Sequence, residues 1–261
     1  MCSANMSNQF LTGHEMTFTS KQDALRDRLR IIQSLQNPTV DELSSLLDLF
    51  SDPNGNALLQ VAAVPVFQRA GIDAVSLLFA AYQHISDPAS DVKIRISYAL
   101  SQISETPAFV FEEMLSCKTA RIRQNAVIGL AGKNDRTFDA LLYGLILRDS
   151  DPQTAYEAAA ALAKGGADVL PYFESVMDRG LKQNPYIASE TKINTSDTQG
   201  TSASLPDPHV LAKVIEIAGD IGNDRTLRSL TPYLPHPDAR ISRLAAESIR
   251  KIKTKLMTEN G

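Results

Sequence analysis

The chain has 261 residues, of which 43% are hydrophobic, and its formal net charge at neutral pH is −4. This hydrophobic content can build a sizeable core, which argues against disorder of the whole chain. No run approaches the roughly 18 apolar residues of a membrane span, and the N-terminus lacks the basic start and apolar stretch of a secretion signal. The acidic balance argues against nucleic acid as a general partner. The two cysteines, Cys2 and Cys117, form no disulfide framework, so we expect a cytoplasmic protein with no membrane partner.

The first elements are predicted from local signals. Residues 1–20 mix Ser, Asn, Thr and Met without a period, and we expect them to form a disordered tail. A helix is predicted over 21–36, which ends before Pro38 because proline disfavours helical geometry in the residue that precedes it. The next helix, over 39–50, begins at Thr39 with Glu42 three residues later, the spacing of a capping box.

A helical pattern then returns six times. If the first core residue of each copy is position 0, positions 4, 7 and 8 are also small or apolar, and together they form one face of a helix with a 3.6-residue period. We call the six predicted helices the striped helices. Their position 0 is Leu59, Val92, Ile122, Thr154, Val210 and Ile241, with spacings of 33, 30, 32, 56 and 31 residues.

A second apolar helix is predicted between neighbouring striped helices. These helices are expected over 73–85, 107–116, 136–148, 167–177 and 225–234. Pairing each with the striped helix that follows it gives six antiparallel hairpins, the first of which joins 39–50 to 56–70. A period near 30 residues with one apolar stripe per copy is typical of stacked helical repeats, because a single helix pair cannot bury its apolar face alone.

The ends of the striped helices carry recurring signals. Asp151-Pro152 and Asp207-Pro208 are predicted to begin two of them, since aspartate accepts hydrogen bonds from free amides and proline is tolerated in the first turn. Position 12 is often glycine or asparagine, which suits the left-handed residue that closes many helices. It is Gly71, Asn134, Gly166 and Gly222 in four copies.

The interval of 56 residues breaks this rhythm. Its surplus falls at 179–206, within the fifth hairpin, where the second half is rich in Ser and Thr and almost without apolar residues. We predict a long loop there, because such a segment cannot bury enough surface to order itself. Two interpretations remain open: a tolerated insertion without function, or a loop that orders on a partner or is modified at Ser or Thr.

Several motifs of the striped helices resemble a known repeat. Val92-Lys93, Ala99-Leu100, Ile122-Arg123 and Ala218-Gly219-Asp220-Ile221-Gly222 are similar to the consensus of HEAT-like repeats of the phycobilisome-lyase type. The resemblance implies an all-α protein, a right-handed α-solenoid of about six hairpins over 21–256, whose striped helices line the concave surface. Residues 257–261 are expected to form a disordered C-terminus.

The same resemblance implies a binding role. The leading hypothesis is a non-enzymatic protein–protein interaction module, a scaffold, adaptor or assembly factor, that binds a partner on the concave face. The alternative is a bilin lyase or a chromophore-detaching factor that acts on phycobiliproteins and binds a tetrapyrrole. Under this alternative Tyr82, Tyr98, Tyr156 or Arg123 would touch the bilin.

The residues proposed for partner binding are Lys93, Arg95, Arg121, Arg123 and Tyr156. The four cations lie near the start of two striped helices and could form a basic patch for an acidic partner segment. A second interpretation is that Lys93 and Arg123 pair with turn aspartates such as Asp87 and Asp91. No catalytic, cofactor-binding or metal-binding residue is predicted, because the four histidines are scattered and the sequence has no phosphate-binding loop or nucleophile elbow.

Overall fold

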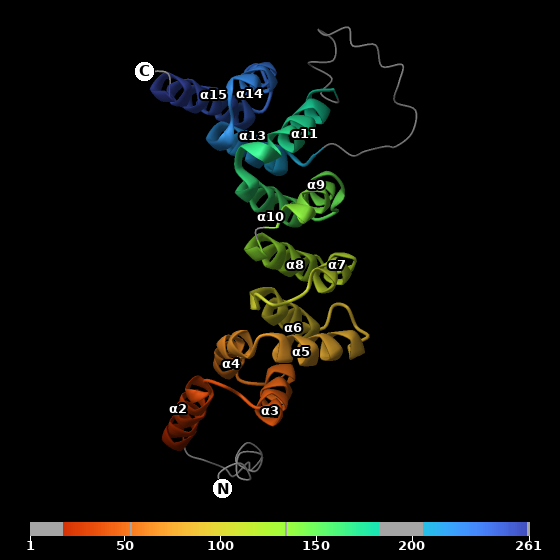
Figure 1. Cartoon of the computed structure of the whole chain (residues 1–261), viewed down its shortest axis with the longest axis vertical. Helices are drawn as coiled ribbons and strands as arrows, with labels where there is room; N and C mark the ends of the chain where they lie inside the picture. Colours follow the sequence, from red (N-terminus) through yellow and green to blue (C-terminus); the bar gives the residue numbers. More distant parts are fainter. Residues whose placement is uncertain (1–17, 53, 134, 183–205, 260–261) are drawn as a thin grey trace. The chain divides into compact units, whose positions relative to one another are not determined.

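The computed structural model describes residues 18–52, 54–133, 135–182 and 206–259, and these residues form helices joined by turns, with no strand among them (Figure 1). The predicted all-α class is therefore confirmed. Packing divides the chain into two compact units, Met1–Gly129 and Leu130–Gly261. We call them the N-terminal unit and the C-terminal unit and describe each one separately.

The N-terminal unit is built from helices that cover one another's apolar faces. Helix α4 packs against α2, α3 and α5, and α6 packs against α3, α4 and α5, so the striped helices α4 and α6 lie side by side as predicted. In the core the ring of Phe50 meets the ring of Phe67 edge-on, with centroids 5.6 Å apart. The helices are α2 (Phe18–Ser34), α3 (Val40–Ser51), α4 (Ala57–Ala70), α5 (Ile72–His84), α6 (Asp91–Gln102) and α7 (Ala108–Leu115), followed by the first part of α8 (Ala120–Lys133).

The C-terminal unit is organised around α13, which packs against α10, α11 and α15. The hydroxyl of the buried Tyr233 donates a hydrogen bond to the carbonyl of Met177 and so ties the end of the α14 segment to α11. The α-helices are α9 (Asp139–Arg148), α10 (Pro152–Leu162), α11 (Leu170–Lys182), α13 (Pro208–Ile221), α14 (Asp224–Leu230) and α15 (Ala239–Glu259). Short 3-10 segments occupy Arg136–Phe138, Ala163–Val169 and Thr231–Tyr233.

The buried stripe is confirmed in every striped helix. The side chains or glycine positions at 0, 4, 7 and 8 are buried, except for Val92 and Ile249, which are partly exposed. The six observed helices are α4, α6, α8, α10, α13 and α15. Burial of these positions is the main stabilising contribution that the sequence pattern predicts. Removing a large apolar side chain from water stabilises the fold by about 1.5–3 kcal/mol.

Most predicted helix ends are also confirmed. Thr39 Oγ1 accepts from the amide of Glu42, and Glu42 Oε2 accepts from the amide of Thr39 at 2.8 Å, which completes the capping box. Asp151 accepts from the amide of Thr154, and Asp207 accepts from the amide of His209. Pro152 and Pro208 open these two helices.

The glycines at position 12 differ in their roles. Gly71 and Gly166 have positive φ values of 58° and 62°, which suit glycine, but their ψ values of −127° and −140° differ from the predicted left-handed helical conformation. Asn134 lies outside the described residues. For Gly222 the prediction was wrong, because its φ is −67°. The constraint there is space: a Cβ on Gly222 would overlap the carbonyl oxygen of Ala218 and lie 2.7 Å from Cδ1 of Ile252.

Three segments differ from their predicted bounds. Helix α2 begins at Phe18, inside the predicted tail, and α15 continues to Glu259, beyond the predicted end at 256. Helix α11 continues to Lys182, so the first residues of the predicted loop at 179–206 are helical. The remaining part of that loop at 183–205, the tail at 1–17 and the terminal residues 260–261 lie outside the described residues.

Candidate functional site

Two of the predicted partner-binding cations hold turns of the N-terminal unit in place. Lys93 Nζ donates to the carbonyl of Ile85 at 2.8 Å and lies 4.4 Å from the ring centroid of Tyr82. Arg123 is only 8% exposed, and its Nη1 donates to the carbonyls of Cys117 at 3.0 Å and Lys118 at 2.9 Å. Lys93 therefore bonds a backbone carbonyl at the end of α5, where a cation also complements the helix dipole.

The other two cations, Arg95 and Arg121, have neutral partners. Arg95 donates to Oε1 of Gln60 at 2.6 Å and to the carbonyl of Asp52 at 3.3 Å. Arg121 is exposed and donates to Oε1 of Gln124 at 3.2 Å. Within the described part of the chain, neither guanidinium is paired with a carboxylate. Arg121, the exposed one of the two, thus remains available to an acidic group from outside, whereas Arg95 is partly buried.

Large apolar side chains are exposed on the same helices. Val61 of α4 is 69% exposed, Tyr98 of α6 is 43% exposed, and Ile128 of α8 is 40% exposed. They occupy positions 2 and 6 of their copies, which lie opposite the buried stripe at about 100° of rotation per residue. We call Val61, Arg95, Tyr98, Arg121 and Ile128 the N-terminal surface.

Hydrogen bonds between the helices keep this surface in register. Gln60 bonds Arg95 near the start of α4 and α6, and Gln68 Nε2 donates to the carbonyl of Gln102 near their ends, so the two helices run parallel. The buried Asn125 of α8 donates to the carbonyl of Ile94 at 3.2 Å and to Ser97 Oγ at 2.7 Å. Neighbouring striped helices are therefore fixed to one another by polar contacts beside their apolar stripes.

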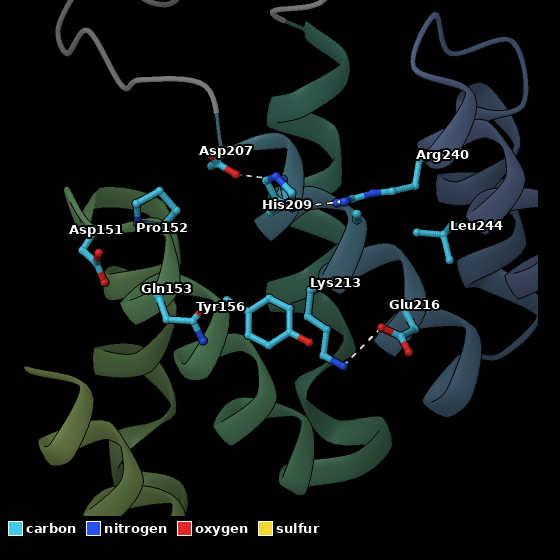
Figure 2. Close-up of a pocket in the computed structure, with 11 residues that line it drawn as sticks. Asp151, Pro152, Gln153, Tyr156, Asp207, His209, Lys213, Glu216, Arg240 and Leu244 are labelled. Atoms are coloured by element: carbon cyan, nitrogen blue, oxygen red, sulfur yellow. Dashed lines mark hydrogen bonds and ion pairs between the residues drawn. The ribbon is translucent and has the colours of Figure 1, made fainter. Parts of the chain in front are cut away.

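The C-terminal unit contains an open pocket of about 630 Å³ on the equivalent face of its striped helices (Figure 2). The lining residues recur at the same positions of the repeat: position −1 gives Gln153, His209 and Arg240, position 2 gives Tyr156 and Ala212, position 3 gives Lys213 and Leu244, and position 6 gives Glu216. The residues before the helices α10 and α13, together with the first residue of α10, complete the lining with Asp151, Asp207 and Pro152.

Two pairs of polar side chains lie in this pocket (Figure 2). Lys213 Nζ lies 3.2 Å from Oε2 of Glu216 and 5.2 Å from the ring centroid of Tyr156. Burial lowers the pKa of Lys213, but the hydrogen bond to Glu216 and its negative charge outweigh this effect, so the net pKa is raised. On the other side, Arg240 Nη1 lies 3.0 Å from Nδ1 of His209.

The structure thus distributes the predicted site residues over both units. Tyr156 lines the pocket of the C-terminal unit, whereas Lys93, Arg95, Arg121 and Arg123 belong to the N-terminal unit. Six further residues of these surfaces were not predicted from the sequence: His209, Lys213, Glu216 and Arg240 of the pocket, and the exposed Val61 and Ile128. All of them could have been found by reading positions −1, 2, 3 and 6 across the copies, which are the positions that the buried stripe leaves outside.

The described residues can also be assessed for a metal site and for a membrane-spanning helix. No group of three or more His, Cys, Asp or Glu side chains in these residues is placed so that it could hold a metal ion. Among the same residues, no helix combines the length and the apolar character that crossing a membrane requires.

Comparisons with known proteins give only distant likenesses. No family model and no curated protein matches the sequence. The chain is similar to the structure of human deoxyhypusine hydroxylase in complex with glycerol, with 14% identity, a TM-score of 0.31, and coverage of 82% of this chain and 97% of that chain. An engineered protein is similar with 13% identity and a TM-score of 0.33, over 92% of this chain and 76% of the other. Identities and TM-scores as low as these support no conclusion about the activity of this chain.

Proposed function

We propose that this protein is a non-enzymatic interaction module that binds an acidic segment of a protein partner on the exposed face of its striped helices. The observation that carries the proposal is the N-terminal surface, where two guanidinium groups that have no carboxylate partner among the described residues lie on the same helices as exposed apolar side chains. Arginine and aromatic residues are enriched where protein partners bind. Contiguous exposed apolar patches that are rimmed by polar residues mark sites where protein partners bind.

The chemistry of the surface defines the partner. Val61, Tyr98 and Ile128 would contact apolar side chains, and Arg95 and Arg121 would donate hydrogen bonds to carboxylates beside them. Arg121 is the better probe of this contact, because it is exposed and, among the described residues, bonds a glutamine, whereas Arg95 also holds the carbonyl of Asp52. We expect the binding to weaken as salt increases, since exposed ion pairs are screened.

The test compares proteins captured from the native cell extract by the wild-type chain and by the double variant Arg121→Glu/Tyr98→Ala. We expect the double variant to lose a partner that the wild type retains at low salt. The matched control is Arg228→Glu, an exposed arginine on α14 in the other unit, which should retain that partner. Identical capture by the wild type and the double variant would contradict the proposal.

The bilin alternative has less structural support. Tyr82 is 2% exposed and Arg123 is 8% exposed, so neither presents a surface to a chromophore, and burial raises the pKa of Tyr82 well above its ordinary value. Tyr98 and Tyr156 belong to different units. Incubation of the protein with a linear tetrapyrrole separates the two functions, because a red-shifted absorbance band would favour a bilin lyase or detaching factor over the interaction module.

A further inference from the structure

The pocket of the C-terminal unit contains one cation whose charge is not balanced by a neighbour. Among its other charged lining residues, Glu216 pairs with Lys213, whereas the carboxylates of Asp151 and Asp207 accept from neutral amides of the first turns of α10 and α13. Arg240 donates to an imidazole nitrogen, and no described carboxylate forms an ion pair with it. Arg240 is therefore the cation of the lining that has no ion-pair partner among the described residues, and it lies in an open cavity.

The contact between Arg240 and His209 makes His209 a second hydrogen-bond donor of the pocket. A guanidinium can only donate, so Nδ1 of His209 is the acceptor and its ring carries the proton on Nε2. This leaves an N–H of His209 and the remaining N–H groups of Arg240 for another acceptor. The apolar groups of the lining are Leu244, which lies near Arg240 (Figure 2), Ala212, and the ring of Tyr156, which lies beside Lys213.

We propose that this pocket binds a carboxylate carried on a short apolar stem, such as the side chain or the free C-terminus of a peptide, with Arg240 and His209 as its donors. A carboxylate brings one negative charge and can accept two parallel hydrogen bonds from the guanidinium of Arg240. A dianionic phosphate would bring a second charge near Asp151, Asp207 and Glu216. The inference is independent of the proposed function, because its residues all lie in the C-terminal unit.

The test uses the imidazole signals of the protein in NMR spectra, which are few because the chain has four histidines. Comparison with a His209→Gln spectrum assigns the signal of His209. The full-length protein is then titrated at constant neutral pH with an N-acetylated, C-amidated tri-glutamate peptide and, separately, with N-acetyl tri-alanine that has a free carboxyl terminus. We expect a saturable shift of the His209 signal with at least one of them, and the effective peptide identifies the source of the carboxylate.

Two variants and two further ligands make the result decisive. Arg240→Gln should abolish the saturable shift, whereas Arg243→Gln, an exposed arginine of α15 outside the lining, should retain it. An amidated tri-lysine peptide should cause no saturable shift. The proposal is overturned if neither carboxylate peptide moves the signal, if the shift survives in Arg240→Gln, or if tri-lysine or inorganic phosphate at equal concentration produces the same shift. A failure here would leave capture by the N-terminal surface unaffected.

Discussion

At the scale of single residues, two arginines of α8 that are two positions apart have different environments. Arg123 is buried and donates to two backbone carbonyls, whereas Arg121 is exposed and bonds one glutamine. We expect Arg123→Ala to lower the free energy of unfolding by about 1–3 kcal/mol, because it removes a buried guanidinium and leaves the carbonyls of Cys117 and Lys118 without this donor. Arg121→Ala should change it by no more than about 0.5 kcal/mol.

Urea unfolding followed by circular dichroism measures both variants under the same conditions. Equal stabilities of the two variants would refute a structural role for Arg123. The repeat predicts part of the distinction, since Arg121 lies at position −1, which the buried stripe leaves outside, whereas Arg123 lies at position 1. The bonding partners of Arg123 could not be predicted. Only the course of the turn at Cys117 and Lys118 brings carbonyls within reach of one of them.

At the scale of elements, the capping of α3 and α6 gives a matched pair. Thr39 caps α3 with its side chain, whereas Ser90 precedes α6 and makes no capping hydrogen bond. Thr39→Ala should therefore cost about 1 kcal/mol of stability, the usual effect of losing an N-cap. Ser90→Ala should be nearly neutral. Thermal unfolding of the two variants tests this, and a loss at Ser90 as large as that at Thr39 would show that side-chain capping does not explain the effect.

The same scale shows what the sequence could and could not predict. The stripe was predictable because burial of one helix face needs only the 3.6-residue period, and local caps such as Thr39 and Asp151 act within a few residues. The reason for glycine at position 222 was not predictable, because the side chain of Ile252 from another helix limits the space there. The repeat positions predict that Tyr156 and the other lining residues lie outside the stripe, but they do not predict the pocket itself, because its partners come from α13 and α15, more than fifty residues along the chain.

At the scale of the whole molecule, each unit has a core of its own. Phe50, Phe67 and Leu78 are fully buried in the N-terminal unit, and Phe173, Ile215 and Tyr233 are buried in the C-terminal unit. In helical repeats each element is stabilised mainly by its neighbours, so a local defect need not spread along the chain. A suitable defect is offered by Gly219 of α13, where an added Cβ would lie 2.7 Å from Cα of Ser248 in α15.

We therefore predict that Gly219→Ala destabilises the C-terminal unit selectively, by about 1–3 kcal/mol, because α13 and α15 must separate to admit the methyl group. Hydrogen exchange measured by mass spectrometry should become faster in α13 and α15 and remain unchanged in α3 and α4. Gly144→Ala is the control within the same unit: nothing lies within 4 Å of its added Cβ, so alanine should preserve or raise protection of α9. Equal loss of protection in α3 and α13 would instead mean that the two units unfold as one cooperative structure.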